Sequence, residues 1–161
     1  QSDHNRLWCE HCNETYEMNE YGQLIHTQGN GIFNHIPDWF EWERQKVREE
    51  IINHQYHVSL DVVVDSLPNS TGFYRLGQGQ LTHNDEGFKL KIKQKNHILV
   101  IHKHPLENYG VHVEYNYFGK GHCLSFSTIN DTYYIFPINQ SYSVTKFHFA
   151  VEELYIFKKN N

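Results

Sequence analysis

Two cysteines near the start of the chain give the sharpest chemical signal in the sequence. Cys9 and Cys12 are separated by two residues. A turn of this length can direct two thiolates toward one tetrahedral Zn²⁺. The sequence therefore predicts a structural zinc ligand pair at Cys9 and Cys12, although one pair supplies only half of such a site.

Three alternatives exist for the other half of this site. His26 and His35 are candidate ligands, but the eight residues between them exceed the roughly three to five typical of zinc fingers. A second cysteine pair upstream of Gln1 is another possible source of the missing ligands. A chain that begins without Met is expected to be a fragment of a longer protein. In the third alternative, both cysteines are reduced thiols on a loop, where they would be redox-active.

A second signal is a stripe of lysines at alternate positions. The lysines are Lys89, Lys91, Lys93 and Lys95. A strand would place them on one face, with Phe88, Leu90 and Ile92 behind. Such a face can bind the head groups of anionic lipids, with about 1 kcal/mol for each lysine near the membrane surface. The alternative is the solvent side of an amphipathic strand.

No catalytic motif accompanies these signals in the sequence. A Gly-x-Ser-x-Gly elbow, a phosphate-binding Gly-rich loop with Lys, a dinucleotide fingerprint and a His-Glu-x-x-His motif are all absent. The 13 histidines are scattered, so we expect most of them to be surface or hydrogen-bonded residues.

The composition indicates a globular protein without a nucleic-acid partner. The 161 residues have 39% hydrophobic and 20% charged residues, a net charge of −5 and a pI near 6.2. Only residues 81–161 carry an excess of bases, with 9 Lys and Arg against 7 Asp and Glu, so an anion-binding patch is expected there. Three cysteines do not form a disulfide framework, which favours a cytoplasmic location. No run approaches the roughly 20 apolar residues of a membrane span.

The elements that must position these residues are mostly strands. Residues 7–31 predict a small hairpin with the cysteine turn at its tip, and a capping box at Asp38 and Glu41 predicts a helix to about residue 54. Alternation or turn spacing predicts strands over 56–65, 73–76, 88–95, 97–103, 111–118, 122–128, 133–138 and 143–149. Residues 150–157 fit a last strand or a terminal helix.

These elements predict an α+β fold that is mainly β. We expect an antiparallel barrel or sandwich, preceded by a half zinc ribbon and one amphipathic helix. A terminal helix would make the element order suit a pleckstrin-homology-like barrel. The expected divisions are residues 1–35 for the partial zinc-ribbon-like hairpin, 36–55 for the connecting helix and 56–161 for the β-rich domain.

Strings along nearly the whole chain show a resemblance to a known family. The strings are Asn5-Arg6-Leu7-Trp8-Cys9-Glu10-His11-Cys12, Tyr21-Gly22-Gln23-Leu24, Phe33-Asn34-His35-Ile36-Pro37-Asp38-Trp39-Phe40, Asp65-Ser66-Leu67-Pro68-Asn69, Leu81-Thr82-His83, Asp131-Thr132-Tyr133-Tyr134 and Glu152-Glu153-Leu154-Tyr155. They resemble the region after the catalytic domain in Gram-positive bacterial proteins of the 1-acylglycerol-3-phosphate acyltransferase (lysophosphatidate acyltransferase) family.

The resemblance implies a non-catalytic accessory domain of a phospholipid-biosynthesis transferase. In that family, Cys9 and Cys12 would match the second half of a zinc ribbon, with zinc complete only in the intact protein. Acyltransferases of this class use a His and an Asp separated by four residues. His102 and His148 have Glu107 and Glu153 at that spacing, and no histidine here has an Asp. The partner would be an upstream acyltransferase domain in the same chain.

The expected role of this region is to dock or regulate the enzyme at an anionic membrane surface, as a peripheral protein. One alternative is a stand-alone pleckstrin-homology-like module that binds lipid or peptide. Another is a small zinc enzyme that uses Cys9, Cys12 and histidines.

Overall fold

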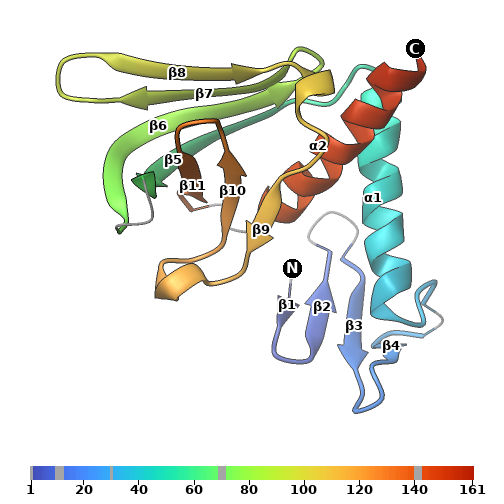
Figure 1. The fold of residues 1–161 in the computed structure, drawn as a ribbon. Coiled ribbons are helices and arrows are strands. Elements are labelled where there is room, and N and C mark those ends of the chain that lie inside the picture. The colour runs from blue at the N-terminus through green and yellow to red at the C-terminus, as the bar shows by residue number, and fades with distance from the viewer. Residues whose placement is uncertain (1, 10–12, 30, 69–71, 140–142) are drawn as a thin grey trace. The chain divides into compact units, whose positions relative to one another are not determined.

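The chain divides into two compact units, Gln1–Lys46 and Val47–Asn161. The structure is a computed structural model that describes residues 2–9, 13–29, 31–68, 72–139 and 143–161 (Figure 1). The helix α1 (Ile36–Ile52) contributes residues to both units. Among the described residues, no helix combines the length and apolar character needed to cross a bilayer.

The first unit contains a small antiparallel sheet with the strand order β1-β2-β3-β4. Its strands are β1 (Ser2–Asp3), β2 (Arg6–Trp8), β3 (Thr15–Met18) and β4 (Leu24–His26). Antiparallel pairing of β2 with β3 agrees with the hairpin expected over residues 7–31. The sheet and α1 share a core of Tyr16, Leu24, Phe33 and Trp39.

The helix α1 begins earlier than the sequence predicts. The backbone N–H groups of Asn34 and His35 donate to the Asp38 carboxylate at 3.2 and 3.0 Å, so Asp38 lies within the first turn. The predicted capping box, with Asp38 at the cap and Glu41 three residues later, is therefore wrong. Pro37 fits the first turn because backbone N–H groups there have no intrahelical acceptor.

The second unit is built on one seven-stranded antiparallel sheet with the order β8-β7-β6-β5-β11-β10-β9. The strands are β5 (Val58–Ser66), β6 (Tyr74–Asn84), β7 (Gly87–Lys93), β8 (Ile98–Lys103), β9 (His112–Glu114), β10 (Cys123–Ser127) and β11 (Thr132–Pro137). Two 3-10 turns, η2 (Pro105–Glu107) and η3 (Tyr117–Gly119), flank β9. Within the described strands, β8 and β9 are the two edges of this sheet, so it does not close into the expected barrel. The predicted mainly β class is confirmed.

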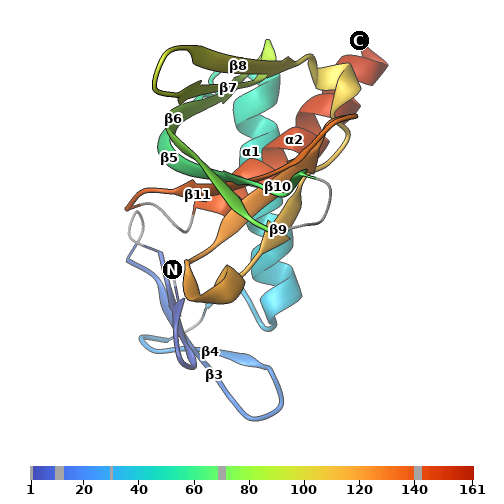
Figure 2. The ribbon, with the colours of Figure 1, turned by 60° about the vertical axis from the view of Figure 1, so that its left-hand side comes forward.

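The sheet is strongly curved, and its inner face encloses the core. The Phe88 ring on β7 lies 4.7 Å from the Phe126 ring on β10, although three strands separate β7 from β10 in the sheet. Figures 1 and 2 show this curvature, most clearly in β6. The core consists mainly of the inward residues of these strands, including Leu60, Val62, Val64, Leu81, Phe88, Leu90, Ile92, Leu124, Phe126 and Ile135.

A C-terminal helix, α2 (Ser143–Asn160), completes this core. Val144, Phe147 and Val151 recur at helical spacing and pack against the sheet. A second face of α2 packs against the end of α1, in a cluster of Val47, Ile51, Tyr56, Phe149, Ala150 and Leu154. The strand predicted over 143–149 is therefore wrong, and residues 150–157 belong to the terminal helix.

Two glycines explain why β6 is longer than predicted. The expected strand stops at residue 76, but β6 continues through Gly77 and Gly79 to Asn84. A Cβ atom at Gly79 would collide with the carbonyl oxygen of Lys91, and one at Gly77 with that of Lys93. The glycines therefore allow β7 to approach closely where the sheet bends.

Candidate anion-binding face

The lysines of β7 lie together on the outer face of the curved sheet. Lys89, Lys91 and Lys93 are exposed, whereas the alternating Phe88, Leu90 and Ile92 are buried. Lys95 is also exposed, but it follows the end of β7 in the connection to β8. We call Lys89, Lys91 and Lys93, with their outward neighbours on β6 and β8, the lysine face.

The neighbouring edge strand adds apolar side chains to the lysine face. Lys91 pairs with Val100 of β8, and Lys93 pairs with Ile98. Val100 and Ile98 are 50% and 61% exposed, which is high for branched aliphatic side chains. The face thus combines positive charge with exposed apolar surface, as peripheral membrane-binding surfaces do.

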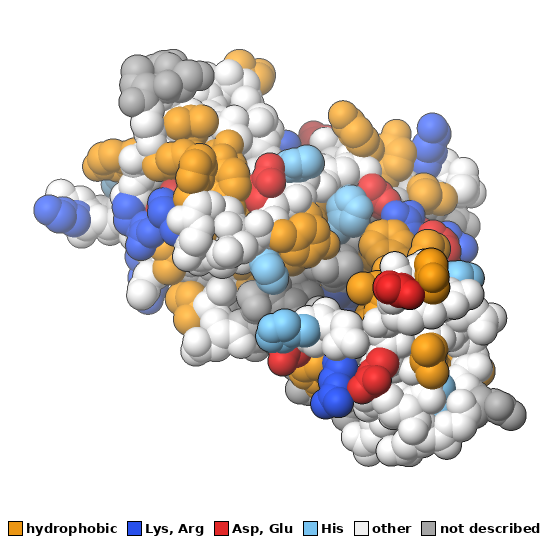
Figure 3. Space-filling view, turned by 90° about the horizontal axis from the view of Figure 1, so that it is seen from below, with side chains coloured by type: hydrophobic (Ala, Val, Ile, Leu, Met, Phe, Trp, Pro, Cys, Tyr) orange, Lys and Arg blue, Asp and Glu red, His pale blue; other side chains and the backbone are white. Residues whose placement is uncertain are grey.

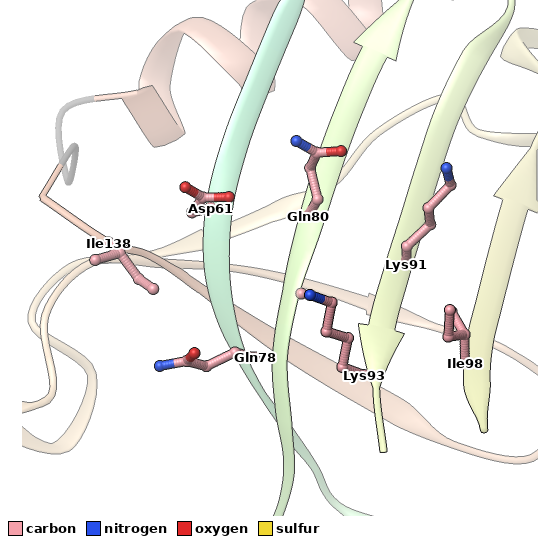
Figure 4. A pocket seen from close by; sticks show the side chains of 8 residues that line it. Asp61, Gln78, Gln80, Lys91, Lys93, Ile98 and Ile138 are labelled. Carbon is pink, nitrogen blue, oxygen red and sulfur yellow. The ribbon is translucent and has the colours of Figure 1, made fainter. Parts of the chain in front are cut away.

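A shallow pocket of about 470 Å³ lies within the lysine face. Its lining residues are Asp61, Gln78, Gly79, Gln80, Lys91, Lys93, Ile98 and Ile138. Figure 4 shows the Lys93 side chain reaching toward β6, and the Asp61 carboxylate on β5 beyond Gln80. Ammonium and amide groups can donate to phosphate oxygens, while the Asp61 carboxylate can accept from a hydroxyl.

The one deeply buried histidine among the described residues lies in the core rather than on this face. His83 is 2% exposed and its Nδ1 lies 3.1 Å from the Tyr56 hydroxyl. Burial lowers the pKa of His83 to about 4 and, with Glu50 nearby, raises the pKa of Tyr56. His83 is therefore neutral at pH 7 and packed against Phe147, with ring centroids 4.8 Å apart, which is a structural role.

A cluster that no sequence motif predicts lies where β5 ends and β6 begins. The rings of Phe73, Tyr117, Phe118 and Tyr134 contact one another at centroid distances from 4.7 to 5.8 Å, and we call them the aromatic cluster. Tyr117 and Tyr134 are stacked, with an interplanar angle of 10°. Neither regular spacing nor a motif joins these residues in the sequence, so only the fold brings them together.

A buried carboxylate holds two cations beside the aromatic cluster. The Asp65 side chain is 2% exposed and accepts from Arg75 at 2.5 Å and from Lys120 at 2.9 Å. Burial alone would raise the pKa of Asp65, but the hydrogen bonds from Arg75 and Lys120 outweigh it and hold the pKa below its usual value. The Lys120 ammonium also lies 5.3 Å from the centre of the Phe73 ring, a cation–π contact.

The predicted zinc ligands lie in the first unit. Cys9 directly follows β2, and its backbone N–H donates to the Glu14 carbonyl at 2.9 Å. Cys12 lies outside the described residues. Of the alternative ligands, His26 contacts the Glu14 carboxylate and His35 precedes α1. Within the described part of the chain, no three His, Cys, Asp or Glu residues are grouped to hold a metal ion.

The third cysteine belongs to the second unit. Cys123 begins β10 and is 0% exposed. Burial, together with the nearby Glu114 and Asp65 carboxylates, raises the pKa of its thiol to about 12. Cys123 is therefore a protonated packing residue at pH 7.

Comparison with known proteins returns no matching family model, no matching curated protein and no matching solved structure.

Proposed function

We propose that this chain is a non-catalytic accessory domain that docks a lysophospholipid acyltransferase on an anionic membrane through the lysine face. The observation that carries this proposal is the placement of Lys89, Lys91 and Lys93 on one exposed face, beside the exposed Ile98 and Val100. Such lysines attract an anionic surface by about 1 kcal/mol each, while the aliphatic side chains can enter the head-group layer.

The local roles of two glutamates support an accessory rather than a catalytic function. Glu107 follows His102 at the family's His–Asp spacing, but its carboxylate accepts from the backbone N–H of His104 at 3.0 Å and caps η2. Glu153 follows His148 at the same spacing, but it is buried and accepts from Arg48 at 2.7 and 3.0 Å. Both carboxylates thus stabilise local structure. In this proposal, acyl transfer belongs to an upstream domain, and zinc binds Cys9 and Cys12 in the intact protein.

A second candidate is a stand-alone module of the pleckstrin-homology type. The observation that favours it is α2, since a helix after seven antiparallel strands is the element order that suits such a domain. This candidate needs no acyltransferase partner. Assaying acyl transfer to lysophosphatidate with a longer parent protein separates the two candidates, because only the first one requires an active parent and an inactive 161-residue chain.

Sedimentation with vesicles tests membrane docking directly. We expect the chain to bind vesicles that contain phosphatidylglycerol at low salt, and to bind poorly at high salt or to phosphatidylcholine alone. Replacing Lys89, Lys91 and Lys93 with Gln should reduce binding by about 100-fold, as roughly 1 kcal/mol per lysine implies.

A matched control removes the same number of charges elsewhere. Replacing Lys46, Lys158 and Lys159 with Gln changes the net charge equally, but leaves the lysine face intact. This control should bind within about threefold of the parent chain. Equal losses in the two triple variants would show a non-specific charge effect and would contradict the proposal.

A further inference from the structure

We infer that the aromatic cluster is a membrane-insertion element, which enters the head-group layer of the same anionic bilayer with Phe118 at its tip. This inference rests on the proposed membrane docking and adds a second contact to it. The lysine face would supply attraction over a distance, and the aromatic cluster would supply apolar contact at the surface.

Phe118 has an unusual conformation that supports insertion. Its side chain is 74% exposed, and its backbone is left-handed, with φ 48° and ψ 34°. A bulky residue rarely adopts this region, because its Cβ crowds the backbone. Its ring makes edge contacts with the rings of Tyr117 at 4.7 Å and Phe73 at 5.7 Å. The fold therefore displays an apolar ring outward at a conformational cost, as functional sites often do.

The side chains of the aromatic cluster are of the types found at membrane–water interfaces. Tyr117 and Tyr134 combine an apolar ring with a polar hydroxyl, and Phe73 and Phe118 are entirely apolar. Aromatic residues of this kind gather at membrane–water interfaces, where one end of the side chain is apolar and the other is hydrated.

Exposed cations lie beside the aromatic cluster. Arg75 and Lys120 both pair with Asp65, while a second carboxylate, Glu114, lies near Tyr117. The Asp65 side chain is 2% exposed, whereas Arg75 and Lys120 are 59% and 41% exposed. The cations thus face the surroundings and the carboxylate lies beneath them. This arrangement complements anionic lipid phosphates.

The aromatic cluster and the lysine face lie on the same outer side of the sheet. Val63 of β5 pairs with Gln78 of β6, which lines the pocket in the lysine face. On its other side, Val63 pairs with Phe136 of β11. The Phe136 ring in turn lies 5.9 Å from the Lys120 ammonium. Figure 3 shows hydrophobic side chains at several places on the surface, with Lys and Arg side chains beside some of them. A bilayer that contacts both groups would therefore lie against one side of the sheet.

The experiment compares Phe118→Asn with Ile129→Asn in the 161-residue chain. Asn tolerates the left-handed backbone, so Phe118→Asn removes the ring without adding strain. Ile129 is fully exposed in the turn at the opposite end of β10. In about 0.15 M salt, where the lysine attraction is only partly screened, Phe118→Asn should bind phosphatidylglycerol vesicles about tenfold more weakly than the parent. Ile129→Asn should match the parent.

Tryptophan fluorescence supplies a second measurement of depth. The native Trp8, Trp39 and Trp42 all belong to the unit Gln1–Lys46, so the parent chain gives their background. Above this background, Phe118→Trp should show a blue-shifted emission on vesicles and quenching by brominated lipid, whereas Ile129→Trp should show neither.

The outcomes separate this inference from the proposed function. If vesicle binding requires the lysines but Phe118→Asn binds like the parent and Phe118→Trp is not quenched, the insertion inference is wrong and docking stands. A peptide or protein partner for the aromatic cluster would give that same result. If the parent chain binds no anionic vesicles at all, both proposals fail.

Discussion

The charge balance at the end of β5 depends on one side chain, the Asp65 carboxylate. It is buried beneath Arg75 and Lys120 and pairs with both. Removing a carboxylate that accepts two charged hydrogen bonds leaves its partners without their acceptor. Asp65 should therefore contribute to the stability of the second unit as well as to the charge of its surface.

We expect Asp65→Asn to lower the free energy of unfolding by about 2 kcal/mol at pH 7. Because the pKa of Asp65 is lowered in the folded state, its contribution is complete above the unfolded pKa of about 4. That contribution is lost as the pH falls through the folded pKa. Urea unfolding at several pH values should show the difference between parent and variant shrinking below about pH 4.

The exposed Asp61 on the same strand provides the control. Asp61→Asn should change stability by less than about 0.5 kcal/mol. If Asp61→Asn and Asp65→Asn are equally destabilising, the paired carboxylate has no special role.

His83 predicts a second pH dependence, at higher pH. Its folded pKa of about 4 lies below the unfolded value of about 6.5, so the unfolded chain binds more protons between these values. Stability should therefore fall by about 2 kcal/mol from pH 7 to pH 5. His83→Gln should remove this part of the pH dependence, and urea unfolding of both chains at the two pH values measures it. An unchanged slope would show that His83 is accessible to protons in the folded state.

Among the elements, the strands with strict alternation were the predictable ones. β7 and β8 follow the pattern of residues 88–103, and the exposure of Lys89, Lys91 and Lys93 follows from the burial of the residues between them. The sequence predicts β6 too short, because Gly77 and Gly79 have no side chains. They therefore interrupt the alternation of apolar and polar residues that indicates a strand. The sequence predicts a strand at the start of α2, because Phe147 and Phe149 alternate around a histidine. The helical spacing of the buried residues becomes visible only over the longer range from Val144 to Leu154.

The bend in β6 depends on Gly79. We expect Gly79→Ala to destabilise the chain by about 3 kcal/mol or more, because its Cβ would collide with backbone of β7, which cannot move as a flexible side chain would. Gly110→Ala is the matched control, since nothing lies within 4 Å of the added Cβ. Thermal unfolding of both variants measures the difference. A Gly79→Ala variant as stable as Gly110→Ala would mean that β6 and β7 separate at little cost.

At the scale of the whole molecule, the candidate site was predictable only in part. The lysines were visible in the sequence, but the aromatic cluster joins η3, β11 and the start of β6, which are far apart along the chain. A sequence pattern reports local periodicity, whereas this cluster depends on the curvature of the sheet. The zinc prediction at Cys9 and Cys12 stays a prediction.

The division into two units predicts that the lysine face binds anionic vesicles without the small sheet of the first unit. A fragment of residues 36–161 keeps α1 whole and retains the α1–α2 cluster. We expect it to fold cooperatively by circular dichroism and to bind phosphatidylglycerol vesicles within about twofold of the full chain, since the lysine face lies entirely in Val47–Asn161. A folded fragment that has lost binding would place part of the membrane contact in the first unit.

The burial of Cys123 restricts where an oxidant can act on this protein. Oxidation and alkylation proceed through the thiolate, and the Cys123 thiol is both enclosed and protonated at neutral pH. The other cysteines in the sequence, Cys9 and Cys12, both belong to the first unit. A maleimide label should therefore leave Cys123 unmodified, so any labelling of the folded chain is expected in the first unit.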